Sequence, residues 1–135
     1  AEFIAPLALK RGKSIELIGV DEPVLIVGNA EMIRRATRNL VENALHHTPE
    51  GTTIEIVVGQ DGSISVIDNG DGVPPENRES IFKRFWRQST RASGGAGLGL
   101  SIVKKIVEAH HGSITVEDAP GRGARFIMRF PLLLA

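Results

Sequence analysis

Hydrophobic positions along the chain repeat with two different periods, and the changes between them separate helices from strands. Over residues 30–47 apolar side chains recur every three or four positions, which predicts an amphipathic helix with Asn29 as its N-cap. A second helical pattern covers residues 97–111, with Gly112 as its C′ residue. A shorter one runs over roughly residues 76–86, so three helices are expected.

Short apolar runs separated by turn residues predict the strands. They are expected as three pairs, each joined by a turn: 13–20 with 24–29, 52–59 with 63–68, and 113–118 with 124–132. Hairpins therefore outnumber strand–helix–strand units. The expected fold is α+β, a two-layer sandwich in which about three helices cover one face of a mixed, mostly antiparallel sheet.

Size and composition narrow the class of protein. The 135 residues predict a single domain, and 16 basic against 16 acidic residues provide no net field that would attract nucleic acid or a membrane. The absence of cysteine excludes disulfides and thiolate metal sites. Because the chain begins in the middle of a pattern, it is expected to be a fragment of a longer protein, with residues 1–11 as linker or vector-derived residues.

Four glycines precede the last helix, at Gly94, Gly95, Gly97 and Gly99. Such a segment either forms a flexible hinge or brings the unpaired N–H groups of a helix start close to an anion such as phosphate. The spacing matches neither the P-loop nor the dinucleotide fingerprint. The glycines thus indicate a phosphate site or a hinge outside the two commonest nucleotide motifs.

Two polar motifs could carry chemistry. The run from Asp68 to Gly72 reads DNGDG at the end of a predicted strand, where a carboxylate could accept a hydrogen bond from an exocyclic amine, or the run could simply form a turn. Asn39 and Asn43 share one helix face. Their amide oxygens could bind a hard cation such as Mg²⁺, or could bond locally at the edge of the core.

Five motifs in order resemble the ATP-binding catalytic domain of sensor histidine kinases, within the superfamily that includes DNA gyrase and MutL-type ATPases. The resemblance extends over residues 12–132 and implies the Bergerat-type version of the expected sandwich. It rests on NLVENA (39–44), DNGDG (68–72), IFKRFWR (81–87), GGAGLGLSIVKKI (94–106) and GRGARF (121–126).

The resemblance implies roles for residues on both sides of a bound ATP. Asp68 would hold the adenine amino group, Gly70 and Gly72 would let the base approach the backbone, and Val73 would form an apolar wall. Asn43 would ligate Mg²⁺, and Asn39 would lie near the phosphates.

The phosphates would lie under a lid formed by residues 87–96. The resemblance implies that Arg87 and Arg91 reach the phosphates, and that Asn39, Asn43 and Arg87 act in the transfer step. The lid hinge and the helix start that faces the phosphates would be formed by Gly95, Gly97, Leu98, Gly99 and Leu100.

Two departures from the family pattern affect the expected site. His46 and His47 occupy positions where a lysine and an aromatic residue are frequent, so His46 would face phosphate and His47 could stack. Ala124 replaces a frequent threonine, which removes one hydroxyl donor.

The resemblance implies that the chain binds Mg-ATP and donates the γ-phosphoryl group to a histidine. The acceptor would lie on a separate dimerisation domain of the same full-length protein, because none of the four histidines here has the H-E-[LF]-[RK] context. The isolated chain is therefore not expected to phosphorylate itself. A response regulator would be the next partner, and the domain would face the cytoplasm in a membrane-bound sensor kinase without touching the membrane.

Two alternatives stay open at this level. One is a regulatory or interaction module that binds nucleotide without catalysis. The other is an ATPase of the gyrase and MutL type, which places a glutamate base where this chain has Asn39. The neighbouring Glu42 lies about 100° around the helix from Asn43, so geometry makes it a poor substitute.

Overall fold

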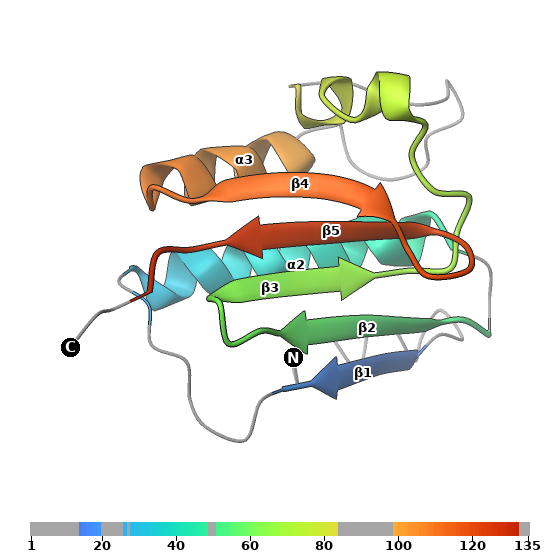
Figure 1. Ribbon diagram of the computed structural model, residues 1–135, viewed down its shortest axis with the longest axis horizontal. Coiled ribbons are helices and arrows are strands. Elements are labelled where there is room, and N and C mark those ends of the chain that lie inside the picture. Colours follow the sequence, from blue (N-terminus) through green and yellow to red (C-terminus); the bar gives the residue numbers. More distant parts are fainter. Residues whose placement is uncertain (1–13, 20–25, 27, 49–50, 84–98, 133–135) are drawn as a thin grey trace.

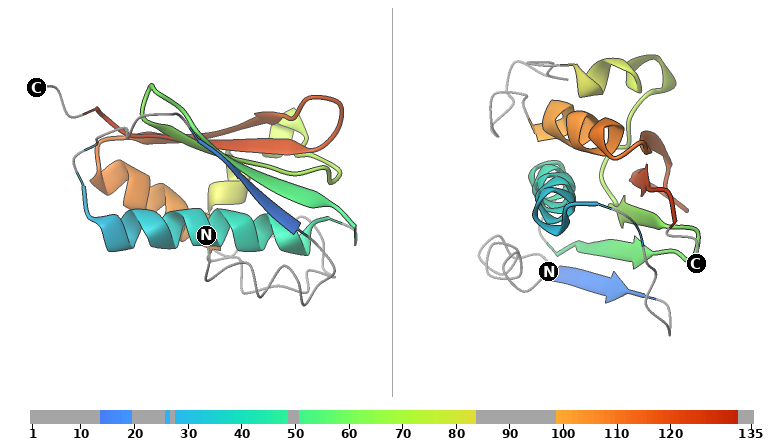
Figure 2. Two further views of the ribbon diagram at one scale, coloured as in Figure 1. Left: turned by 90° about the horizontal axis from the view of Figure 1, so that it is seen from below. Right: turned by 90° about the vertical axis from the view of Figure 1, so that its left-hand side faces the viewer.

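The computed structural model describes residues 14–19, 26, 28–48, 51–83 and 99–132. Its five strands form one sheet, and two α-helices lie on the same face of that sheet (Figures 1 and 2). The strands are β1 (Ser14–Ile18), β2 (Thr53–Val58), β3 (Ser63–Ile67), β4 (Ser113–Asp118) and β5 (Ala124–Arg129). The helices are α2 (Ala30–His46) and α3 (Gly99–Ala109). The predicted α+β two-layer sandwich is confirmed.

The sheet has the order β1-β2-β3-β5-β4 and is antiparallel except at one edge. There β1 runs parallel to β2, with Ser14 opposite Thr53. The sequence predicted that 13–20 would pair with 24–29, but Ile26 makes an antiparallel bridge to Leu132 instead, and residues 24, 25 and 27 lie outside the described residues. The parallel pair is possible because α2 carries the chain back across the sheet between its two strands.

Helix α2 forms as predicted. The side-chain oxygen of Asn29 accepts a hydrogen bond from the Met32 N–H at 3.1 Å, which caps the first turn. One stripe of the helix is buried against the sheet and α3, and it consists of Ala36, Leu40, Val41, Ala44 and Leu45.

The end of α3 differs from the prediction by one residue. His111, with φ of 62°, adopts the left-handed conformation that was expected of Gly112. The His111 N–H donates to the Glu108 carbonyl at 3.1 Å and the Gly112 N–H donates to the Val107 carbonyl at 2.8 Å, which is a Schellman motif with His111 at C′. Gly112 is needed for another reason, because a Cβ there would overlap the carbonyl of Arg129.

The helix predicted over residues 76–86 is not continuous. Within the described residues this segment forms two 3-10 turns, η1 (Pro75–Asn77) and η2 (Ser80–Phe82), while residues 84–86 lie outside them. Phe82 is buried and packs edge-to-face on Phe126, with ring centroids 6.2 Å apart. Phe82 therefore has a packing role in the hydrophobic core.

The end of α3 and the start of α2 both lie at the left in Figure 1, and His110, which follows α3, joins them. Its Nε2 accepts a hydrogen bond from the Asn29 N–H at 3.0 Å, and its Nδ1 lies 2.7 Å from the Ile106 carbonyl oxygen. The ring also packs edge-to-face on Phe130. The start of α2 is therefore held to the end of α3. In the described part of the chain, no helix has the length and apolar character needed to cross a membrane.

Candidate functional site

The segments that carry three of the motifs, NLVENA, DNGDG and GRGARF, lie toward the right-hand end of the sheet in Figure 1. The C-terminal end of α2, the end of β3 and the turn between β4 and β5 all lie there. Because α2 and β3 both run toward this end, Asn39, Asn43 and Asp68 are brought to the same side of the molecule.

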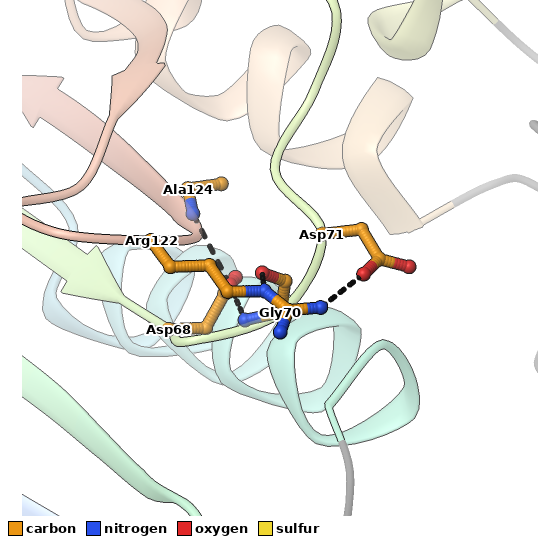
Figure 3. A network of polar contacts seen from close by, with 5 residues as sticks. All are labelled: Asp68, Gly70, Asp71, Arg122 and Ala124. Atoms are coloured by element: carbon orange, nitrogen blue, oxygen red, sulfur yellow. Dashed lines mark hydrogen bonds and ion pairs between the residues drawn. The ribbon is translucent and has the colours of Figure 1, made fainter.

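Asp68 follows β3 directly and is the buried acidic group of the site, with only 4% of its surface exposed. Its Oδ1 accepts hydrogen bonds from the N–H groups of Gly70 at 2.9 Å and Ala124 at 3.2 Å (Figure 3). Its own N–H donates to the Ala124 carbonyl at 3.0 Å. No hydrogen bond to Oδ2 comes from the described part of the chain. One carboxylate oxygen is thus fixed by the backbone, and the second keeps its capacity to accept.

Burial raises the pKa of the Asp68 carboxyl above its ordinary value. The N–H groups of Gly70 and Ala124 and the nearby His47 oppose this rise, because each of them stabilises the ionised form. The pKa remains raised, so the site holds a carboxylate whose charge is only partly compensated.

Glycines let three backbone segments meet around Asp68. A Cβ on Gly70 would lie 2.6 Å from the carbonyl oxygen of His47, and a Cβ on Gly123 would overlap the carbonyl of Asp68 itself. Gly72, with φ of +78°, adopts a conformation that side chains rarely allow. These glycines have a packing reason that is independent of the predicted close approach of a ligand, which stays a prediction.

The predicted residues next to Asp68 have contrasting exposure. Val73 is half-buried and packs on the hydrophobic core, as Leu100 does from the start of α3. His46 and His47 are exposed at the end of α2. Val73 thus offers an apolar surface, and the imidazole of His47 lies near enough to the Asp68 carboxylate to interact with its charge.

Asn39 and Asn43 lie one turn apart on α2 and are half-buried. Neither side-chain amide makes a hydrogen bond within the described part of the chain. Half-buried amides usually have partners. Their free oxygens fit a hard cation, which accepts neutral oxygen ligands alongside phosphate and water.

The whole predicted lid, residues 87–96 with Arg87, Arg91 and Gly95, lies outside the described residues, as do Gly97 and Leu98 of the predicted hinge and helix start. Gly99 is described and is the first residue of α3, where it is exposed. Among the described residues, no atom would lie within 4 Å of a Cβ on Gly99, so packing against them does not require a glycine there.

Two arginines at the site were not found by sequence reasoning. Arg122 donates from Nε to the Gly70 carbonyl at 3.0 Å and from Nη2 to Asp71 at 2.6 Å (Figure 3). Arg78 donates from Nε to the Val73 carbonyl at 3.1 Å and from Nη2 to Asp118 at 2.8 Å. Arg122 falls within a motif of the resemblance, but its partners are about fifty residues away in sequence, so no local pattern connects them.

Comparison with known proteins gives concordant results. The family described as "Histidine kinase-, DNA gyrase B-, and HSP90-like ATPase" matches residues 28–134. The sensor histidine kinase CpxA of Escherichia coli K12 is 38% identical over 129 residues, which is 93% of this chain and 28% of CpxA. The sensor-like histidine kinase SenX3 of Mycobacterium tuberculosis H37Rv is 38% identical over 115 residues, 81% of this chain and 28% of SenX3. The chain thus spans little more than a quarter of the length of these two curated relatives.

Solved structures resemble the whole described fold. The nucleotide-free catalytic domain of the histidine kinase ThkA superposes with a TM-score of 0.83 and 29% identity, covering 96% of this chain and 87% of that one. Full-length ShkA in complex with AMPPNP superposes with a TM-score of 0.83 and 30% identity, covering 99% of this chain and 28% of that one.

Proposed function

The chain belongs to the histidine kinase-, DNA gyrase B- and HSP90-like ATPase family, and we propose that it binds ATP with Mg²⁺ and donates the γ-phosphoryl group to a protein histidine. Its sensor histidine kinase relatives and the AMPPNP complex of ShkA support a kinase role with an adenine nucleotide. The acceptor histidine would lie on the dimerisation domain of the same full-length protein.

The observation that carries the proposal is the half-satisfied carboxylate of Asp68. Two backbone N–H groups hold Oδ1, while Oδ2 receives no hydrogen bond from the described residues. The exocyclic amine of adenine is a donor that would complete this buried group, with Val73 as the apolar wall beside the base. A guanine would present a carbonyl oxygen at the same place, so the site would favour adenine.

Helix α2 would serve the phosphate end of the nucleotide. Asn43 would ligate Mg²⁺ through its free amide oxygen, with Asn39 near the phosphates one turn earlier. The ion would neutralise charge on the triphosphate when bound. His46 would face phosphate and His47 would lie beside the base or ribose.

The lid residues complete the proposal. Arg87 and Arg91 would reach the phosphates, Gly95 and Gly97 would form the hinge, and Leu98 would lie at the start of the helix. Gly99 would expose the first N–H groups of α3, where the helix dipole favours an anion. No described residue approaches a Cβ at Gly99 within 4 Å, which is consistent with a glycine kept for the ligand rather than for packing against them.

Transfer is favoured over hydrolysis by the groups available on α2. An ATPase of the gyrase and MutL type needs a carboxylate base, and the corresponding residue here is Asn39. The nearest alternative, Glu42, lies on another side of the helix and accepts a hydrogen bond from the Nε of Arg38 at 3.1 Å. We therefore infer positioning for transfer rather than activation of water.

The direct test is transfer in trans from labelled ATP. The chain is mixed with Mg²⁺, ATP labelled at the γ-phosphate and the dimerisation domain of the same full-length protein. We expect acid-labile, base-stable label on that domain, none on this chain alone, and a loss of about a hundredfold or more with Asn43→Ala. Release of labelled phosphate without any transfer would overturn the proposal in favour of an ATPase. Absence of both reactions despite nucleotide binding would favour a regulatory module.

A further inference from the structure

Two arginines hold the segment that follows Asp68 from its outer side. Arg122, in the β4–β5 turn, donates to the Gly70 carbonyl and to Asp71. Arg78, in the turn between η1 and η2, donates to the Val73 carbonyl and to Asp118 at the end of β4. Each guanidinium uses Nε for a carbonyl of the segment 70–73 and Nη2 for a carboxylate.

The repeated arrangement connects the hairpin of β4 and β5 to the loop that leaves β3. Gly70 donates its N–H to Asp68, so the carbonyl and the N–H of one residue are bound by Arg122 and Asp68 respectively. Any movement of Gly70 would therefore disturb one of the two hydrogen bonds that hold Oδ1 of Asp68. Figure 3 shows Arg122 lying across this loop with Asp71 beyond it.

The exposure of both side chains indicates that the Arg122 contacts order the loop without contributing much to the free energy of unfolding. The side chain of Arg122 is 70% exposed and that of Asp71 is 87% exposed. Ion pairs this accessible contribute little to the free energy of unfolding, because water and salt screen them. A fully folded protein without Arg122 is thus expected, with a less ordered loop.

We propose that Arg122 is a positioning residue for nucleotide binding, which holds the Gly70–Val73 segment so that Asp68 is oriented before the ligand arrives. The proposal rests on the proposed nucleotide site at Asp68. Arg122 acts through Gly70 and Asp71 rather than on the ligand, and Arg78 supports the other end of the same segment.

The first experiment compares affinity for a non-hydrolysable ATP analogue by calorimetry. Loss of one carbonyl hydrogen bond and one exposed ion pair predicts that Arg122→Ala raises Kd by about 3- to 20-fold. Asp71→Asn is expected to raise Kd in the same direction by about 2- to 5-fold. The double variant should bind about as weakly as Arg122→Ala alone, because both changes remove one shared contact.

The direction in which Asp71→Asn changes Kd distinguishes a positioning role of Arg122 from a simple charge effect. If Arg122 only attracted the phosphates through space, removal of a nearby negative charge at Asp71 would tighten binding instead of weakening it. Arg122→Lys keeps the charge but lacks the planar fork that binds Gly70 and Asp71 together, so it should also raise Kd, whereas a simple charge effect would leave Kd unchanged. Arg129→Ala is the matched control, because Arg129 is an exposed arginine of β5 whose side chain contacts Thr115 at the other end of the hairpin.

The second experiment needs no nucleotide. Hydrogen exchange is measured on the free 135-residue chain, where Arg122→Ala should speed exchange across residues 69–78 and leave α2 and β2 unchanged. Unchanged exchange together with unchanged Kd would overturn the proposal, as would tighter binding by Asp71→Asn. A wild-type chain that binds no adenine nucleotide would instead overturn the proposed function, while hydrogen exchange would still decide whether Arg122 orders the loop.

Discussion

At the scale of single residues, the ionised carboxylate of Asp68 lowers the stability of the nucleotide-free chain. Burial raises its pKa, and the two backbone N–H groups and His47 compensate only in part. Isolated buried charges are unfavourable unless fully hydrogen-bonded. The free oxygen of Asp68 is therefore a cost to the folded chain that a bound donor would offset.

This cost predicts that Asp68→Asn does not destabilise the nucleotide-free chain. Asparagine keeps an Oδ1 acceptor for Gly70 and Ala124 but carries no charge, so the free energy of unfolding at pH 7 should equal or exceed that of wild type. The measurement is urea unfolding of both proteins without nucleotide. A clearly less stable variant at pH 7 would contradict the account.

The pH dependence follows from the direction of the shift. Between the ordinary carboxyl pKa of 3.8 and the raised pKa of the folded state, the native chain binds more protons than the unfolded chain. The contribution of Asp68 to stability therefore falls as pH rises through that window and is constant above it. The advantage of Asp68→Asn should accordingly be largest above the window and should fade as pH falls through it.

At the scale of the elements, the end of α3 shows two adjacent residues with opposite requirements. His111 carries a side chain in a left-handed conformation that favours glycine, while Gly112 meets the backbone of Arg129 so closely that a side chain does not fit. Both residues follow Ala109, the last residue of the helix, and belong to its Schellman motif.

We predict opposite effects on stability for substitutions at these two positions. His111→Gly should raise the free energy of unfolding by about 0.5–1 kcal/mol, because the left-handed conformation costs glycine nothing. Gly112→Ala should lower it by about 1–3 kcal/mol, because the new Cβ must displace backbone. Urea unfolding midpoints of both variants test this, and equal shifts of the same sign would show that the cap is assigned wrongly.

Elements governed by neighbouring residues were predictable, and those that depend on distant ones were not. The stripe of α2 and the turn at Asp61 between β2 and β3 are local patterns, and both elements formed where expected. The parallel pair of β1 with β2 is set by a crossover through α2, which no local pattern contains. Likewise, the described part of the segment predicted as a helix over residues 76–86 forms two 3-10 turns, the second of which buries Phe82 against Phe126 from β5.

At the scale of the whole molecule, the sheet order brings distant segments of the chain to one end. Asn43 on α2, Asp68 after β3 and Arg122 between β4 and β5 meet there, although they are far apart in sequence. The resemblance to a family identified Asn43 and Asp68 as candidates, but the support from Arg122 needed the folded arrangement. The roles of the lid residues remain predictions.

This chain is much shorter than its curated relatives CpxA and SenX3. It spans 28% of CpxA and of SenX3, so the acceptor histidine, the response regulator and any cytoplasmic placement belong to proposals about the complete protein. What this chain can test alone is the capacity to hold the nucleotide.

The most direct measurement is calorimetric titration of the chain with a non-hydrolysable ATP analogue, with and without Mg²⁺, beside Asp68→Asn. The account predicts micromolar binding by wild type that is stronger with Mg²⁺. The loss of a charge-assisted hydrogen bond predicts weakening of about 10- to 150-fold in the variant. Equal affinity of the two proteins, or no binding by the folded wild-type chain, would contradict the claim that Asp68 is the centre of an adenine-nucleotide site.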